Sequence, residues 1–184
     1  MTAFDHLPLL TERLRMRPLH TGDAEALFAI FSDPRVMRYW STEAWTSFEQ
    51  AHAMIALDEA GMASGEHLRL GLVRSGDAAL LGTCSLFRID RACRRAEIGY
   101  ALASSAWGQG YMHEGLRRLV DYGFNELGLN RIEAEIDTRN GSSARSLERL
   151  GFVREGLLRE RWIVGQEVSD SALYGLLRRD WPQP

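Results

Sequence analysis

Lysine is absent from this 184-residue chain, because all 22 basic residues are arginines. The absence excludes chemistry that depends on lysine, including the phosphate-binding lysine of a P-loop and the Schiff-base lysine of pyridoxal phosphate enzymes. Cysteine is scarce as well. Cys84 and Cys93 are the only two and form no Cys-x-x-Cys pair, so we expect two reduced thiols. The five histidines show no metal-binding spacing, and we expect no metal site.

Long apolar runs are also missing. No stretch approaches the roughly 20 apolar residues of a membrane span, and the first residues lack the pattern of a secretory signal. We therefore expect a cytoplasmic protein that does not use a membrane. A net charge of −3 is no overall basic signature for nucleic acid. The composition, 45% hydrophobic and 26% charged, is that of an ordinary globular protein, and we expect one domain over 1–184.

Hydrophobic periodicity divides the chain into alternating strands and helices. Strands are expected at 14–18, 68–73, 80–89, 96–102, 131–137, 153–158 and 172–177, and helices at about 24–31, 49–61, 112–127 and 144–150. The order β-α-α-β-β-β-α-β-α-β-β indicates an α/β protein with a mixed sheet and helices on both faces.

Cap residues set the expected helix ends. Thr21 or Asp23 can cap the first helix. Thr46–Glu49 has the pattern of a capping box for the second helix, which we expect to end near Gly61. Gly128 can end the third helix, whose apolar stripe we expect to face the core.

Two glycines, Gly108 and Gly110, stand directly before that third helix. Glycine allows a sharp turn and a close approach of a ligand, and the first amides of a helix attract anions. The pattern therefore predicts a site for a phosphate-bearing ligand. It is not the dinucleotide fingerprint, because His113 occupies the position of the third glycine.

Four ordered motifs resemble the GNAT acetyltransferase superfamily, and within it the RimJ/RimL type of ribosomal-protein N-terminal acetyltransferase. They are the glycine loop Trp107–Met112, the later segment Asn140–Phe152, the opening Leu10–Pro18 and the strand Ala96–Tyr100. The resemblance spans nearly the whole chain. One position departs from the broad superfamily pattern, because Ser105 stands where glutamine or arginine is common.

The resemblance implies a central, mostly antiparallel mixed sheet of about seven strands, splayed between 96–102 and 131–137, with acetyl-CoA in the splay and no metal. The pantetheine arm would pair with the strand backbone, and the pyrophosphate would lie on the loop amides. The implied cofactor contacts are Tyr100, Ala101, Leu102, Gly108, Gln109, Gly110, Tyr111, Met112, Asn140 and Ser143.

Acetyl transfer to an amine requires a neutral nitrogen and a proton for the departing thiolate, so a base is useful. The resemblance implies that Glu97 is that base and acts through a water molecule. The alternative is a solvated or ion-paired strand glutamate, with Arg94 and Arg95 nearby in the sequence.

Ser143 is the candidate that donates to the developing thiolate. Its alternative role is the N-cap of the following helix, which Ser142 could equally provide. Asn140 is either a cofactor contact or a turn residue. Tyr174 is a weaker alternative acid, since a tyrosine on a terminal strand is more often a packing residue.

Aromatic residues surround the expected acceptor entrance. Trp40 and Trp45 could line it or could equally be core residues, and Trp107 could anchor the glycine loop against the core. We expect the segments around 35–48 and 159–170 to be the loops that choose the acceptor.

Three functions remain open from the sequence. The leading one is acetyl-CoA-dependent acetylation of a protein N-terminal α-amine, as in ribosomal proteins. The second keeps the chemistry but uses a small amine such as an antibiotic, polyamine or amino acid derivative. The third is a non-catalytic acyl-CoA sensor, which would need the glycine loop but neither Glu97 nor Ser143. The chain would act as a monomer or a homodimer.

Overall fold

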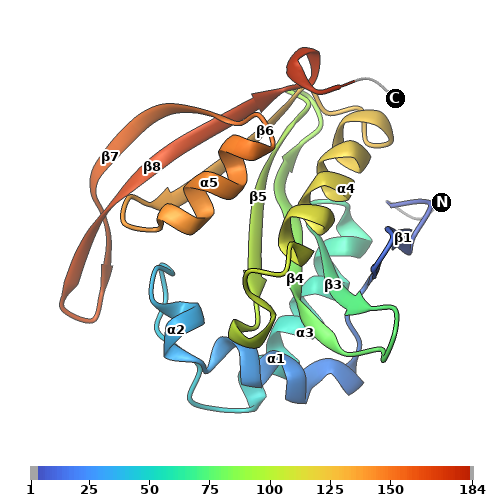
Figure 1. The fold of residues 1–184 in the computed structure, drawn as a ribbon, viewed down its shortest axis with the longest axis vertical. Coiled ribbons are helices and arrows are strands. Elements are labelled where there is room, and N and C mark those ends of the chain that lie inside the picture. The colour runs from blue at the N-terminus through green and yellow to red at the C-terminus, as the bar shows by residue number, and fades with distance from the viewer. Residues whose placement is uncertain (1–3, 183–184) are drawn as a thin grey trace.

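The computed structural model describes residues 4–182 and folds them around an eight-stranded sheet (Figure 1). The strands lie in the order β1-β2-β3-β4-β5-β6-β8-β7, and every neighbouring pair is antiparallel except β5 and β6. Their bounds are β1 Leu9–Leu10, β2 Leu14–Arg17, β3 Leu68–Arg74, β4 Leu80–Asp90, β5 Arg95–Leu102, β6 Arg131–Asp137, β7 Val153–Val164 and β8 Glu167–Leu177. The helices are α1 Ala24–Phe31, α2 Pro34–Met37, α3 Glu49–Ser64, α4 Tyr111–Asn125 and α5 Gly141–Arg149.

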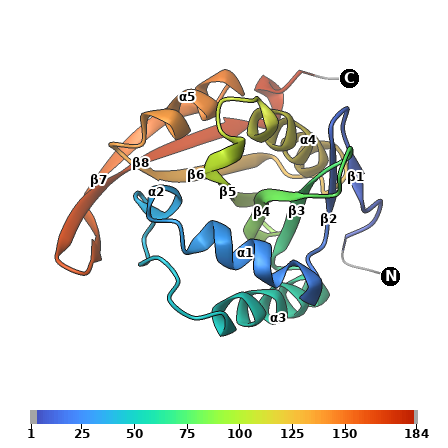
Figure 2. The same ribbon diagram turned by 60° about the horizontal axis from the view of Figure 1, so that its bottom comes forward.

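The expected mixed sheet with helices on both faces is confirmed. In Figure 2, α4 and α5 lie on one side of the sheet, and α1 and α3 lie on the other. The expected apolar stripe of α4 is buried in the larger core, where Leu116, Leu119 and Val120 are fully enclosed. A second core lies between the sheet and the pair α1 and α3.

Three elements differ from the sequence expectation. The two-residue strand β1 and the single-turn helix α2 are too short for periodicity to reveal. The segment 159–170, which we expected to be a loop, is instead the far half of the β7–β8 hairpin. Only Gly165 and Gln166 separate the two strands, because Gly165 takes a positive φ of 59° that suits a tight turn.

The cap predictions were met only in part: Asp23 is the N-cap residue of α1, but its side chain makes no capping hydrogen bond to that helix. The first helical turn is capped by His20, whose ring nitrogen accepts from the Gly22 amide, while the carboxylate of Asp23 accepts from the amide of His20. Helix α3 begins three residues after Thr46 with no side-chain cap of its own, and it ends at Gly65 rather than Gly61.

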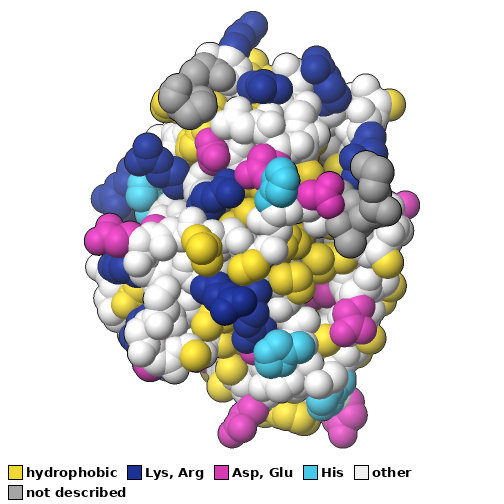
Figure 3. Space-filling view, turned by 90° about the vertical axis from the view of Figure 1, so that its right-hand side faces the viewer, with side chains coloured by type: hydrophobic (Ala, Val, Ile, Leu, Met, Phe, Trp, Pro, Cys, Tyr) yellow, Lys and Arg dark blue, Asp and Glu magenta, His cyan; other side chains and the backbone are white. Residues whose placement is uncertain are grey.

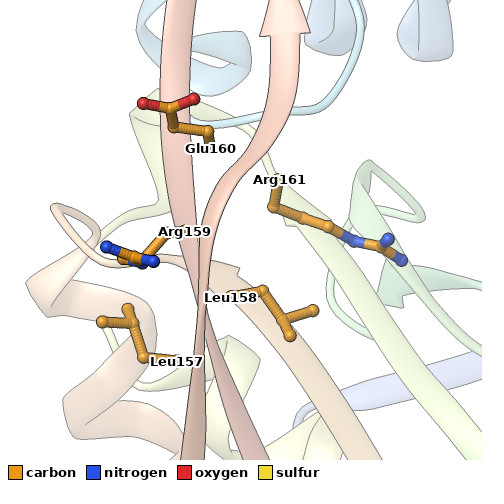
Figure 4. Close-up of a pocket in the computed structure, with 5 residues that line it drawn as sticks. All are labelled: Leu157, Leu158, Arg159, Glu160 and Arg161. Carbon is orange, nitrogen blue, oxygen red and sulfur yellow. The ribbon is translucent and has the colours of Figure 1, made fainter.

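The strand β7 is an irregular edge of the sheet. Its pairing with β8 shifts register after Arg154 and again after Leu158, and Glu160 adopts a φ of 50°. Figure 4 shows the result at the surface hollow along this strand, where Leu157 and Arg159 point to one side and Leu158 and Arg161 to the other. Such bulges blunt an edge against pairing with another strand.

The face that carries β1 and α4 mixes arginines with acidic and apolar side chains (Figure 3). No helix within residues 4–182 is both long and apolar enough to cross a bilayer. No group of three or more potential metal ligands occurs in the same part of the chain.

Candidate active site

The strands β5 and β6 form the expected splay. They pair in parallel at only three positions, from Arg95 opposite Arg131 to Glu97 opposite Glu133. Beyond Glu97 the two strands separate, while β5 stays paired with β4 and β6 stays paired with β8. One side of β5 therefore keeps unpaired backbone groups over 98–102, which an extended ligand could use.

The glycine loop leads from β5 into α4 with the geometry expected of an anion site. Gly108 and Gly110 both take positive φ angles, 73° and 82°, and Gly110 is the N-cap of α4. No side chain caps this helix start, so its first amides are free to bind a ligand. A Cβ built on Gly108 would meet nothing within 4 Å, which shows that the space above the loop is open.

Arg13 holds this loop in place, a role that the sequence did not reveal. Its Nη1 donates to the Gln109 carbonyl at 2.9 Å, and its Nε donates to Glu114 at 2.7 Å. The guanidinium also lies 4.5 Å from the centre of the Tyr111 ring. Because Arg13 is almost 100 residues from the loop, only the fold brings them together.

Trp107 anchors the loop through a hydrogen bond and not through burial. Its ring is 48% exposed, while its Nε1 donates to the Leu102 carbonyl at 2.9 Å. The expected packing against the core is thus absent. Of the three residues expected to pair with pantetheine, Leu102 has a carbonyl that already accepts one hydrogen bond.

A cavity of about 340 Å³ opens where β5 and β6 separate. It brings together Glu97, Tyr100, Asn140, Ser143 and Trp40 from the expected set. It does not reach the glycine loop 108–112, and its wall omits Ala101, Leu102, Trp45 and Tyr174. Lining residues that sequence analysis did not identify include His67, Arg69, Ser85, Phe87, Glu135, Asp137 and Trp162.

Ser143 and Tyr100 form a hydrogen-bonded pair in this cavity. Their hydroxyl oxygens lie 2.6 Å apart, and Ser143 is 8% exposed. Burial raises the pKa of Tyr100 to about 12, so its hydroxyl stays protonated at neutral pH. The N-cap of α5 is Asn140, whose side-chain oxygen accepts from the Ser143 amide at 3.1 Å. The prediction of a serine N-cap is therefore wrong, and the Ser143 hydroxyl is not used to cap α5.

Glu97 is ion-paired, but with a different partner from the two we considered. Both of its oxygens accept from Nη1 of Arg88, at 2.9 and 3.1 Å, because Arg88 lies beside it on β4. Arg95 instead donates to Glu133 at 3.1 Å. The Glu97 side chain is 17% exposed and that of Arg88 is 62% exposed, so the pair is open to solvent on the arginine side.

Some of the aromatic candidates line the cavity, and others pack in the hydrophobic core. Trp40 and Trp45 both pack on Phe31, at ring-centre distances of 5.4 and 4.7 Å, but only Trp40 lines the cavity. Tyr174 is buried in the larger core, and its hydroxyl lies 3.5 Å from Glu148. It is therefore placed as a packing residue.

The charges along the cavity wall are balanced. Each carboxylate that lines it has an arginine partner: Arg88 donates to Glu97, Arg161 to Glu135 at 3.2 Å and Arg139 to Asp137 at 2.6 Å. The Arg139 hydrogen bond holds the pKa of Asp137 below its usual value, so this carboxylate stays charged. The cavity thus has polar walls without a strong excess of negative charge.

Known proteins resemble this chain along nearly its full length. The acetyltransferase (GNAT) domain family matches residues 13–153. An uncharacterized N-acetyltransferase, p20 of Bacillus licheniformis, is 36% identical and covers 94% of this chain and 97% of its own. A spermidine N(1)-acetyltransferase of Vibrio cholerae is 26% identical, covering 88% of this chain and 91% of its own.

Solved structures of acetyltransferases also resemble this chain in fold. A probable acetyltransferase superposes with a TM-score of 0.83 at 31% identity, covering 93% of this chain and 96% of its own. Mycobacterium smegmatis RimJ in complex with CoA-disulfide superposes with a TM-score of 0.82 at 25% identity, covering 92% and 84%.

This chain belongs to the GNAT acetyltransferase family. It is an acetyl-CoA-dependent N-acetyltransferase, as the four motifs indicate, and the RimJ structure supports the narrower branch. The family assignment does not identify the acceptor or the roles of individual residues, so both are inferred from the geometry of the site.

Proposed function

We propose that the chain acetylates the α-amine at the N-terminus of a protein or peptide by direct attack on the thioester of acetyl-CoA. One observation carries this proposal: a single cavity at the splay brings the Glu97 carboxylate and the Tyr100–Ser143 hydroxyl pair together. A base and a donor on the two sides of the splay are what amine acetylation needs.

The two groups divide the proton transfers. The neutral amine attacks the thioester carbonyl, and Glu97 takes the amine proton through a water molecule. The C–S bond then breaks, and the electron pair leaves with sulfur as the CoA thiolate. Ser143 donates a hydrogen bond to that thiolate, while Tyr100 orients the serine hydroxyl. Asn140 contributes by ordering the first turn of α5, whose amides also favour negative charge.

The cofactor would lie across the backbone of β5 and the glycine loop. Tyr100 and Ala101 would offer backbone groups to the pantetheine arm, and the amides of Gly108–Met112 would bind the pyrophosphate. This placement is supported by the similarity in overall fold between this chain and the RimJ structure in complex with CoA-disulfide.

The balanced charge of the cavity favours a peptide over a polyamine. A polycation is bound well by carboxylates that have no other partner, and each of the three that line this cavity is held by an arginine. A peptide N-terminus brings one titrating amine and neutral amides. Trp40 at the wall would pack on the first side chain of the peptide.

The acceptor is tested by direct competition. We expect kcat/KM for peptides with a free N-terminus to exceed that for spermidine by at least about tenfold. Each peptide should also contain a lysine side chain as an internal competitor, and mass spectrometry should place the acetyl group on the α-amine. Efficient acetylation of spermidine without peptide turnover would contradict the proposal and favour the small-amine alternative, which the spermidine-acetylating relative also represents.

The thiolate donor is tested on α5. Ser143→Ala should lower kcat by roughly tenfold to a hundredfold, because one donor to a developing negative charge is lost. Binding of acetyl-CoA should change by no more than a few-fold. Tyr100→Phe should have a smaller effect, and the double variant should be no slower than Ser143→Ala, because the tyrosine acts through the serine. Ser146→Ala on the same helix, where the hydroxyl donates to the Ser142 carbonyl at 3.0 Å, is the matched control. Unchanged turnover in Ser143→Ala would remove the serine from the mechanism.

A further inference from the structure

Arg69 is a half-buried cation in the wall of the cavity with unused donors. It lies on β3, and its side chain is 19% exposed. Its Nη1 donates to Asp58 of α3, with N–O distances of 3.1 and 3.2 Å to the two carboxylate oxygens. An arginine has five N–H groups on three nitrogens, and within residues 4–182 the Nε and Nη2 of Arg69 have no hydrogen-bond acceptor.

The neighbours of Arg69 do not complete its hydrogen bonding. His67 lies on the same wall, and its Nε2 is 3.3 Å from Asp58 without a hydrogen bond of good geometry. Burial lowers the pKa of His67 to about 4, with Arg69 adding to the shift, so the ring is neutral at physiological pH. Asp58 alone therefore compensates Arg69, and it uses only one of the three nitrogens. Within residues 4–182, the Nε and Nη2 groups of Arg69 are not among the buried atoms left without a partner, so they are accessible from the cavity and can donate to an incoming oxygen atom.

The floor of the cavity connects Arg69 to Glu97. Arg69 pairs with Ser85 on β4, and Ser85 pairs with Gly99 on β5, so the three positions form a row across the sheet. Glu97 is two residues from Gly99 on the same face of β5. With strands about 4.8 Å apart and about 3.4 Å per residue, the Cα atoms of Arg69 and Glu97 are roughly 12 Å apart.

Gly99 keeps this floor open. A Cβ at Gly99 would lie 3.1 Å from the Phe87 ring and 3.4 Å from the Ser85 hydroxyl, so any side chain here would crowd both. Arg69 and Glu97 thus line the same cavity, and the floor between them carries the Ser85 hydroxyl and the Phe87 ring but no side chain at Gly99.

We propose that Arg69 binds the carbonyl oxygen next to the acceptor amine, and that it therefore selects α-amino acyl compounds over simple alkylamines. This inference rests on the proposed function, in which the amine itself lies toward Glu97. In a peptide the oxygen belongs to the first amide, and in a free amino acid it belongs to the carboxylate. Both sources present the same acceptor atom, on the carbon attached to the amine-bearing carbon.

The test compares three acceptors that differ only in one group on the amine-bearing carbon, which is a carboxamide in L-alaninamide, a carboxylate in L-alanine and a methyl group in isopropylamine. Rates are expressed per mole of neutral amine, because the amines of the three acceptors differ in pKa. For the unaltered protein we expect kcat/KM to be about tenfold to a hundredfold higher for alaninamide than for isopropylamine, as for a hydrogen bond to a charged group.

The variant that tests the residue is the double change Asp58→Asn with Arg69→Gln, which removes both charges together and so avoids a buried carboxylate without a partner. It should lose the preference for alaninamide over isopropylamine and leave the Kd of acetyl-CoA within about twofold. Asp58→Asn alone should keep the preference. The matched control is Asp77→Asn with Arg74→Gln, an Arg–Asp pair at the other end of β3 and outside the cavity wall.

The outcomes separate this inference from the proposed function. If alanine or alaninamide is preferred over isopropylamine while longer peptides are not acetylated, the peptide proposal fails and the role of Arg69 stands. If the unaltered protein shows no preference, or if the double variant keeps it, the role of Arg69 is overturned. Equal loss of activity toward all three acceptors in the double variant would make Arg69 a structural residue only.

Discussion

Glu97→Gln should lower kcat/KM for a peptide acceptor by about 10²- to 10⁴-fold at neutral pH, the usual contribution of a general base. The glutamine keeps the shape of the side chain and a hydrogen-bond acceptor for Arg88, but it cannot take a proton. The deficit should shrink as the pH rises toward and above about 8, because a larger share of the α-amine is then already neutral. Steady-state rates of CoA thiol release between pH 6 and 9 measure both effects.

Glu135→Gln is the control for charge alone. Glu135 lines the same cavity from β6, accepts a hydrogen bond from Trp162 at 2.8 Å and is 17% exposed, as Glu97 is. Its replacement should reduce turnover far less than Glu97→Gln and should leave the pH dependence unchanged. If both variants lose the same activity, the cavity needs negative charge and Glu97 is not the base.

Gly108→Ala should weaken acetyl-CoA binding by about tenfold or more. The new Cβ would project into the open space above the loop, where we place the pyrophosphate, and it would keep the ligand from the first amides of α4. The measurement is the Kd of CoA by calorimetry, with dephosphorylated pantetheine as a second ligand. Pantetheine lacks the pyrophosphate, so its binding should change little.

A glycine beyond the far end of α4 separates this effect from backbone strain. Gly128 follows the far end of the helix with a φ of 69°, against 73° for Gly108, and a Cβ there would also meet nothing within 4 Å. Gly128→Ala should therefore cost a similar amount of stability, about 1 kcal/mol, and should leave the Kd of CoA unchanged. Equal affinities in the two variants would place the pyrophosphate elsewhere.

Much of the fold could be predicted because its determinants are local. The apolar stripe of α4 follows from helical periodicity, and the sharp turn at Gly108 and Gly110 follows from the conformational freedom of glycine. Some of the predictions that failed were also local, among them the helix caps at Thr46 and at Ser142. A cap depends on where the preceding backbone enters, and Gln50 accepts from the Thr46 amide while Asn140 takes the cap of α5.

The candidate site was only half predictable. Glu97, Tyr100, Asn140 and Ser143 were identified through the family resemblance, and the structure places them in one cavity. Sequence analysis did not identify Arg13, Arg69 or Arg88, because the sequence does not show which residues an arginine will contact in the fold. Tyr174 and Trp45 were considered for the site, but each packs in a core, which only burial could show.

The sequence by itself determined the chemistry that the chain can perform: it has no lysine for lysine-dependent catalysis, it has a glycine loop before a helix, and its motifs resemble a family that uses acetyl-CoA. The tertiary structure decided which charged side chains form ion pairs. The ion pairs that neutralise the cavity, and the unused donors of Arg69, arise where β3, β4, β5 and β6 are placed side by side. The physical reason is that backbone conformation depends on near neighbours, whereas charge compensation depends on residues that the sheet brings together from far apart in the chain.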